Sequence, residues 1–134
     1  MDKCVLAVDP GTVKCGLAVV CKGKPPIWHA VISKSQIAET ALDLISKYSP
    51  TAIVIGAGTG SAEIVSMLQA HVSLPVKIVS EKYTSEQARK RWFCENPPRG
   101  LKRFIPISLL TPDVDIDDYA AIILAENYLE GTVP

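Results

Sequence analysis

The sequence has 134 residues, 48% of them hydrophobic and 21% charged, and its 14 basic and 14 acidic residues cancel. Such a chain is too apolar to be disordered and is expected to form one domain, residues 1–134, around its own core. The balanced charge excludes a global attraction to nucleic acid, so any such attraction must be local. No apolar run approaches the roughly 18 residues of a membrane span. The N-terminus also lacks a signal-peptide pattern, so a cytoplasmic protein with no membrane partner is expected.

The four cysteines, Cys4, Cys15, Cys21 and Cys94, lack the close paired spacing of a zinc site. Three of them fall in expected strands, where a free thiol behaves as a small hydrophobe. We therefore expect all four to be reduced and structural.

The first half of the chain alternates between extended and helical patterns. Extended segments at 3–9, 15–21 and 28–33 are joined by short connections rich in Gly, Pro and Lys, which predicts antiparallel hairpins. Helical spacing over 35–48, with Ser35 as N-cap, predicts the first helix. The apolar run 52–55 is typical of a parallel strand that is covered on both faces.

The second half continues with a Gly-rich loop, 56–61, that opens into a helix, and with another buried strand at 76–79. A short helix is expected at 84–92. Residues 93–113 form a long loop without periodicity, and loops of this length are usually functional or mobile. A last helix is expected at 117–129.

This order of elements predicts an α/β fold with one mixed five-stranded sheet. The expected strand order is 3-2-1-4-5, with strand 2 antiparallel and helices on both faces. The ends of strands 1 and 4 would then lie where the connections diverge, which is where such sheets usually hold their sites.

Acidic residues follow two of these strands. Asp9 ends the first strand and Glu81 follows the fifth, so both should open on one edge of the sheet. A buried acid is costly unless its charge is compensated, although Asp9 could also be an ordinary turn residue. The start of the last helix is crowded with aspartates, some of which are expected to be caps. These are Asp113, Asp115, Asp117 and Asp118.

Three carboxylates from separate elements would repel each other without a cation. Hard oxygen ligands suit Mg²⁺ or Mn²⁺, and two such ions can promote phosphodiester hydrolysis. This chemistry needs no catalytic histidine. His29 and His71 have no ligand spacing, so they are interpreted as an ordinary strand residue and a helix-end residue.

A local basic cluster spans 89–103, a segment with six basic residues and one acidic residue, Glu95. Basic side chains suit phosphate contacts, so we interpret the cluster as a nucleic-acid-binding surface that Lys14, with Lys22 and Lys24 on the hairpin tips, could extend. The six residues are Arg89, Lys90, Arg91, Arg99, Lys102 and Arg103.

Three aromatic residues, Trp92, Phe93 and Phe104, are interleaved with this basic cluster. Aromatic side chains can stack on unpaired bases. For Trp92 and Phe93, packing into the core is the preferred interpretation.

The Gly-rich loop offers a second contact for phosphate. Gly58, Thr59, Gly60 and Ser61 could present backbone N–H groups to it. The alternative is a simple helix-entry turn with Ser61 as the cap.

Three motifs together resemble the YqgF/RuvX family of RNase H-like nucleases, relatives of the RuvC Holliday junction resolvase. LAVDPGTVKCGLAV at 6–19 is similar to the family's opening motif, and SEKYTSEQAR at 80–89 to its Asp-Glu-Arg-x-Ser/Thr-Thr-x-x-Ala-Arg motif. DDYAAIIL at 117–124 is similar to its terminal Asp-x-x-Ala-Ala helix. The resemblance covers nearly the whole chain and implies an RNase H-like fold.

The resemblance implies that Asp9, Glu81 and Asp117 are catalytic and bind Mg²⁺ or Mn²⁺. Asp118 ranks second as the third ligand, and Asp115 third. The implied activity is a metal-dependent endonuclease that matures the 5′ end of pre-16S ribosomal RNA in ribosome biogenesis, with Holliday junction resolution as the older assignment. Because RuvC-type resolvases act as dimers, a homodimer is also implied.

Two other functions stay open. The loop 55–61 is more similar to the YqgF-like domain of the transcription accessory protein Tex, which favours a non-catalytic nucleic-acid-binding module. Actin-like ATPases and sugar kinases share the Asp-x-Gly-Thr core of the first motif, but they need two such domains to enclose a nucleotide.

Overall fold

The computed structural model describes residues 3–81, 84–106, 109, 110, 112 and 115–131. Its strands form one five-stranded sheet in the order β3-β2-β1-β4-β5, in which β2 is antiparallel to both neighbours and β4 is parallel to β1 and β5. The predicted α/β fold and strand order are therefore confirmed. The elements are β1 (Cys4–Asp9), β2 (Lys14–Cys21), β3 (Trp28–Ser33), η1 (Lys34–Gln36), α1 (Ile37–Tyr48), β4 (Ala52–Gly56), α2 (Ser61–Gln69), β5 (Val76–Val79), α3 (Thr84–Glu95), η2 (Gly100–Phe104) and α4 (Asp117–Glu130).

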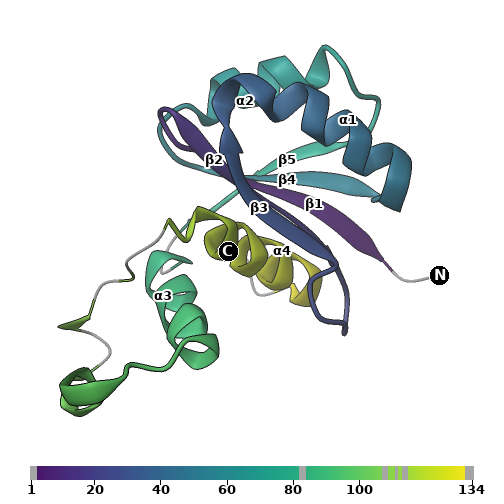
Figure 1. Ribbon diagram of the computed structural model, residues 1–134. Helices are drawn as coiled ribbons and strands as arrows, with labels where there is room; N and C mark the ends of the chain where they lie inside the picture. Colours follow the sequence, from purple (N-terminus) through teal and green to yellow (C-terminus); the bar gives the residue numbers. More distant parts are fainter. Residues whose placement is uncertain (1–2, 82–83, 107–108, 111, 113–114, 132–134) are drawn as a thin grey trace.

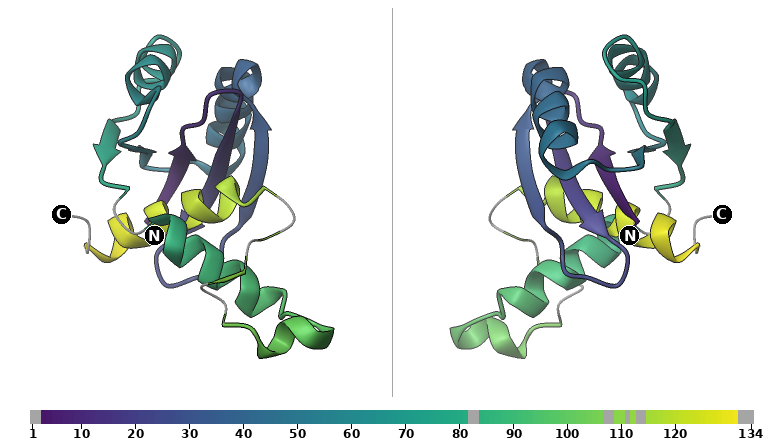
Figure 2. Two further views of the ribbon diagram at one scale, coloured as in Figure 1. Left: turned by 90° about the vertical axis from the view of Figure 1, so that its left-hand side faces the viewer. Right: turned by 90° about the vertical axis from the view of Figure 1, so that its right-hand side faces the viewer.

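Helices cover both faces of the sheet: α1 and α2 lie on one face, and α4 lies on the other with α3 beyond it (Figures 1 and 2). Side chains alternate between faces along a strand. Thus Leu6 and Val8 of β1 join the cluster beneath α1 and α2, whereas Val5 and Ala7 join the cluster against α4. The sequence of β1 therefore supplies both cores.

Small side chains let α4 lie close to the sheet. Ala7 and Ala18 of the strands meet Ala121 and Ala125 of the helix in one buried cluster. All six residues from Ala120 to Ala125 are buried, because the sheet covers one side of α4 and α3 covers the other. The start of α4 is thus held firmly above the sheet.

Three expected details of the elements are corrected. The strand at 76–79 is an edge strand, with Lys77 and Ile78 exposed, rather than a buried one. Ser35 is not an N-cap: it lies in η1, makes no cap hydrogen bond, and its hydroxyl pairs with that of Ser33 at 3.0 Å. Finally, α3 continues to Glu95.

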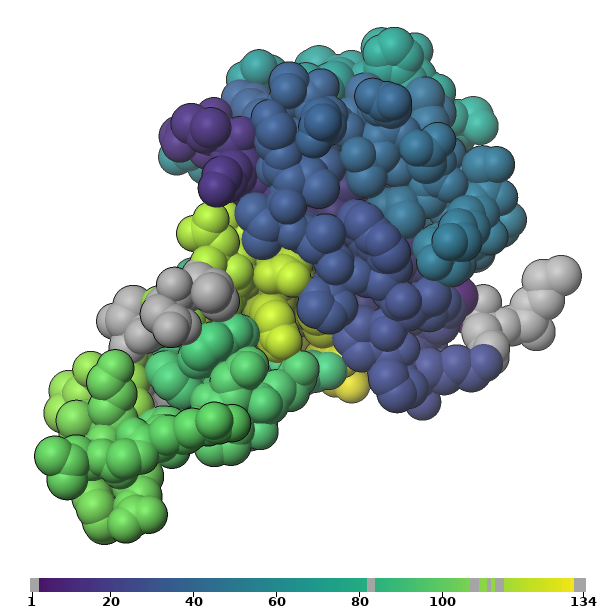
Figure 3. Space-filling view, viewed as in Figure 1, coloured from purple at the N-terminus to yellow at the C-terminus, as the bar shows by residue number. Residues whose placement is uncertain are grey.

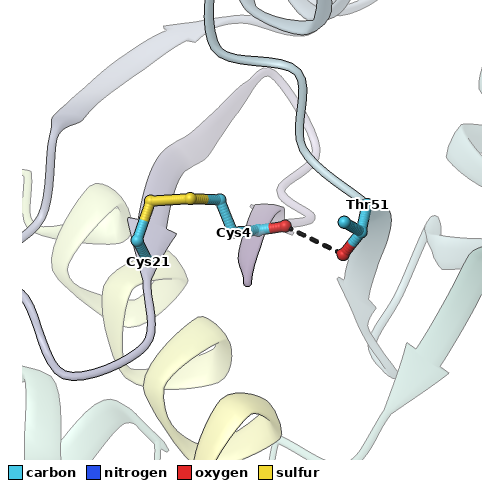
Figure 4. Close-up of a disulfide and its surroundings, with 3 residues drawn as sticks. All are labelled: Cys4, Cys21 and Thr51. Atoms are coloured by element: carbon cyan, nitrogen blue, oxygen red, sulfur yellow. Dashed lines mark hydrogen bonds between the residues drawn. A yellow bond between two sulfur atoms is a disulfide. The ribbon is translucent and has the colours of Figure 1, made fainter. Parts of the chain in front are cut away.

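The expectation that all four cysteines are reduced is wrong for two of them, because Cys4 and Cys21 form a disulfide (Figure 4). They are direct partners in the β1–β2 ladder, with Cα atoms 3.9 Å apart. The Cys4 carbonyl also accepts hydrogen bonds from the Thr51 amide and hydroxyl. Cys15 is a buried free thiol, as expected, and Cys94 is an exposed one.

Within the ranges that the structure describes, no helix has both the length and the apolarity that crossing a bilayer requires.

Candidate active site

Asp9 and Glu81 meet at the edge of the sheet where β1 and β5 end. Asp9 is the last residue of β1, and Glu81 stands two positions after β5. Burial is the largest cause that raises the pKa of Asp9 to about 8, followed by a hydrogen bond with Glu81 and by the charges of Glu81 and Asp117. A hydrogen bond between two carboxyl groups requires a proton on one of them. With a pKa of about 8, Asp9 keeps its proton at neutral pH in the metal-free protein.

The Gly-rich loop after β4 makes room for Glu81. A Cβ built on Gly56 would stand 2.8 Å from Glu81 Cγ, and one built on Gly58 would stand 2.6 Å from Glu81 Oε2. Both distances are shorter than van der Waals contact, so any side chain at these positions would displace the carboxylate. Glu81 Oε1 is buried and has no hydrogen-bond partner within the described part of the chain. Gly56 and the loop after it therefore leave just enough space for the Glu81 carboxylate.

The same loop also starts α2. Gly60 is the N-cap of α2, with φ of 87°, a conformation that favours glycine. Ser61 donates its amide to the Gly58 carbonyl at 3.1 Å and is the first helical residue, so its predicted capping role is wrong. Phosphate binding by Gly58, Thr59, Gly60 and Ser61 stays a prediction.

Asp117 reaches the site because β2 carries a glycine opposite Asp9. Gly16 is the ladder partner of Asp9, and a Cβ built on Gly16 would overlap the backbone of Asp117. The first residue of α4 therefore rests directly on β2. Burial, then the charges of Asp115 and Asp118, raise the pKa of Asp117, while the charge of Lys14 lowers it.

Asp118, the second-ranked ligand, is engaged elsewhere. Its Oδ2 lies 2.7 Å from Nδ1 of His29, and its Oδ1 accepts the amide of Tyr119 at 3.1 Å. The rings of His29 and Tyr119 meet edge to face, 5.4 Å between centroids. Asp115, ranked third, is exposed and pairs with Lys14 at 3.5 Å. These contacts favour Asp117 as the third acid of the site.

His29, expected to be an ordinary strand residue, instead contacts Asp118 through its Nδ1. It lies 89 positions from Asp118, and only the pairing of β3 with β2 beside α4 brings the two together. The one available signal was its place in a strand next to β2. His71 is exposed beyond the end of α2, as expected.

The donor set suits a hard divalent cation. It consists of carboxylate oxygens, which are the ligands that Mg²⁺ and Mn²⁺ prefer. One of them is buried and has no hydrogen-bond partner in the described part of the chain. Among the residues with described positions, no three His, Cys, Asp or Glu side chains form a ready-made metal-binding group. Asp9 and Glu81 are in contact, whereas Asp117 acts on Asp9 through its charge.

The basic residues of α3 differ in their surroundings. Arg91 donates to Glu126 of α4 at 2.6 Å and lies 3.7 Å from Glu95, and the hydrogen bond to Glu126 is the main cause that raises its pKa. Lys90 is exposed and pairs with Glu86 at 3.5 Å. Nε of Arg89 is buried and has no hydrogen-bond partner within the described chain. Arg91 therefore joins two helices and is poorly placed to hold a phosphate.

The lysines of the two hairpin tips do not form one track. Lys14 begins β2 beside the acidic site, whereas Lys22 follows the last residue of β2. The two lysines therefore lie at opposite ends of that strand. Lys22 and Lys24 instead line a cavity of about 350 Å³ with Arg91 and Glu130.

The expected packing into the core is confirmed for Phe93 but not for Trp92, which is only half-buried. Phe93 is buried, and Trp92 meets it edge to face with centroids 4.9 Å apart. Phe104 lies in η2 and is 73% exposed. Phe104 follows three basic residues in the sequence, Arg99, Lys102 and Arg103.

Comparison with solved structures identifies the fold. RuvC from Thermus thermophilus superposes with a TM-score of 0.59 at 14% identity, over 97% of this chain and 98% of RuvC. The chain therefore shares the fold of RuvC, which confirms the RNase H-like fold expected from the sequence. A Ppx/GppA family protein from Aquifex aeolicus superposes with a TM-score of 0.42 at 15% identity, over 72% of this chain. The chain spans 42% of that protein's length.

No protein-family model and no curated protein sequence matches the chain. Its specific resemblance to YqgF/RuvX therefore stays a prediction from the three motifs.

Proposed function

We propose that the protein is a metal-dependent nuclease that hydrolyses phosphodiester bonds in nucleic acid. The observation that supports this most is the hydrogen-bonded pair Asp9 and Glu81 at the sheet edge, where a buried Glu81 oxygen has no partner among the residues that the structure describes. Burying two adjacent acids is costly in an empty protein. A site that has to receive a cation accounts for this arrangement.

Asp9 at the end of β1, Glu81 just after β5 and Asp117 at the start of α4 would hold the ion. Gly56 and Gly58 fix the position of Glu81, and Gly16 admits the first turn of α4 beside Asp9. A divalent cation, when bound, offsets the charge of the acids, activates a water for attack and stabilises the leaving oxygen. Lys14 stands beside Asp115 at the rim, where its positive charge can attract a phosphate.

The substrates that we propose follow from the resemblance to the YqgF/RuvX family and from the fold. Both the YqgF/RuvX motifs and the likeness to RuvC are compatible with two substrates. We propose 5′-end maturation of pre-16S ribosomal RNA first, and resolution of branched DNA second. The alternative is a non-catalytic nucleic-acid-binding module of the kind found in Tex, which the short Gly56–Ser61 connection favours.

The test is cleavage of labelled RNA and branched DNA by the purified protein with Mg²⁺ or Mn²⁺. Cleavage should stop with EDTA, and Asp9→Asn should lower it at least about a hundred-fold while binding persists. Asp43→Asn, an exposed acid of α1, is the matched control and should cleave like the wild type.

Two other results would contradict the proposal. Binding without cleavage of any substrate with either ion would favour the Tex-like module. Absence of salt-sensitive binding to nucleic acid would exclude both functions.

A further inference from the structure

The segment that follows α3 and contains η2 stands away from the body of the protein (Figures 1 and 3). We call residues 96–106, which include η2, the η2 arm. All of its residues are exposed except the half-buried Pro98. Its apolar side chains are unusually open, with Leu101 84%, Phe104 73% and Ile105 41% exposed. Single exposed apolar residues are common, but here three lie within five positions of the sequence.

The charge of the arm has one sign. Arg99, Lys102 and Arg103 lie within it, and the sequence contains no acid from Asn96 to Pro112. None of these three side chains forms an ion pair with another residue of described position. In contrast, Lys90 and Arg91 of α3 both have acidic partners. The cations of the arm are therefore available for an external anion.

Phe104 adds an aromatic surface to these charges. The Arg103 guanidinium carbon lies 4.9 Å from the centroid of the Phe104 ring. The guanidinium therefore covers part of the ring, while most of the Phe104 side chain remains exposed. Bases stack on such rings and on guanidinium planes, and this contact tolerates any base sequence. An exposed ring among cationic side chains is the combination that single-strand-binding surfaces use.

We propose that the η2 arm binds unpaired nucleotides of the substrate, with Phe104 stacking on a base and Arg99, Lys102 and Arg103 contacting phosphates. This inference rests on the proposed function and names its substrate class, nucleic acid with single-stranded or open bases. A closed duplex offers no free base face to the ring. A second copy of the chain fits less well, since a two-fold contact would bring the same three cations of each copy together.

The position of the arm sets the minimum length of such a substrate. The α3 helix begins just after Glu81, whose carbonyl accepts the Thr84 amide, and it has 12 residues. At 1.5 Å per residue it spans about 18 Å, which matches about five stacked nucleotides at 3.4 Å each. Strands shorter than this should not engage the acidic site and the arm together.

The test measures binding in EDTA, so that cleavage does not interfere. The probes are a single-stranded 15-nucleotide RNA with one 2-aminopurine and the blunt duplex of the same sequence. Phe104→Leu should weaken single-strand binding about tenfold and reduce the quenching of 2-aminopurine, without changing duplex binding. Phe104→Trp should retain both signals. Leu42→Ala, at an exposed leucine of α1, is the control and should have no effect.

A second variant tests the cations of the arm. Changing Arg99, Lys102 and Arg103 together to alanine should lower the slope of log affinity against log salt by about two for the single strand. Since all three are exposed, the thermal midpoint should stay that of the wild type, which separates lost binding from lost folding.

The inference is overturned if Phe104→Leu binds the single strand as the wild type does, or loses single strand and duplex equally. It is also overturned if the wild type dimerises in sedimentation experiments and Phe104→Leu abolishes the dimer, because the arm would then be a self-association surface. If the wild type binds neither probe, the proposed function itself fails.

Discussion

Gly16 of β2 and Asp117 of α4 are in backbone contact: a Cβ at position 16 would stand 2.5 Å from the Asp118 nitrogen and closer still to the Asp117 carbonyl. The two residues are 101 positions apart in the sequence, and only the fold brings them together. Because Gly16 is also the ladder partner of Asp9, this one contact sets the spacing between the first and third acids.

Gly16→Ala should force α4 away from β2. We expect a loss of about 1–3 kcal/mol in the free energy of unfolding, as for other overpacked sites, measured by urea denaturation. Gly23→Asn is the control, since Gly23 has φ of 75° with open space around it and Asn tolerates that conformation. Equal stability of Gly16→Ala and wild type would refute the close contact.

Gly58→Ala should move the Glu81 carboxylate without unfolding the protein, because the added methyl meets the flexible end of a side chain. We expect a change below about 1 kcal/mol in stability but a drop of about tenfold or more in Mn²⁺ affinity, measured by calorimetry. Ala57→Ser, at the exposed neighbouring position, should leave both quantities unchanged. Unaltered Mn²⁺ affinity in Gly58→Ala would contradict the role of the loop.

The metal-free protein should lose stability as the pH rises from about 4 to about 8. The pKa of Asp9 is raised from its ordinary 3.8 to about 8, so the folded state binds a proton that the unfolded state has released. The contribution of this proton is complete below pH 4 and disappears as the pH passes 8. In EDTA, Asp9→Asn should flatten this decline, on the order of 2 kcal/mol between pH 5 and 8. Parallel stability curves for the two proteins would contradict the prediction.

Arg91→Ala should weaken the fold rather than the binding of nucleic acid. Its short hydrogen bond to Glu126 joins α3 to α4, and losing a charged hydrogen bond in a part-buried site costs about 1–3 kcal/mol. The thermal midpoint should fall, while the salt dependence of RNA binding stays that of the wild type. Lys90→Ala, on the exposed side of the same helix, should leave stability within about 0.5 kcal/mol.

Reduction of the Cys4–Cys21 disulfide should destabilise the protein by about 2–3 kcal/mol, because the bond closes a loop with a sequence separation of 17. The measurement is denaturation with and without a dithiol reductant. A Cys4→Ser, Cys21→Ser double variant should match the reduced protein and show no response to the reductant. If reductant leaves the wild type unchanged, the two thiols are not joined in solution.

Local patterns were enough to predict the sheet and its order. The alternation in β1, the all-apolar β4 and the hairpins leave few ways to arrange five strands, and the structure confirms the one expected. Asp9 and Glu81 could be predicted to meet because both follow strands that end at the same edge of the sheet.

Contacts that depend on register or on helix rotation could not be predicted. The Cys4–Cys21 pair follows from the β1–β2 register, which depends on the geometry of the turn. The hydrogen bond between His29 and Asp118 depends on where α4 lies above β3. Arg91 had the charge of a phosphate ligand, but its partner Glu126 is fixed by the packing of two helices.

The way α3 packs on α4 affects how cooperatively the protein unfolds. Ala88 of α3 packs with Ala120 and Ile123 of α4 in a small cluster of its own, apart from the two clusters that hold the sheet. A unit with so few apolar contacts opens at a lower free energy than the whole molecule. Amide hydrogens of α3 should therefore exchange well before those of β1 and β4, which makes α3 and the η2 arm the first foldon to open.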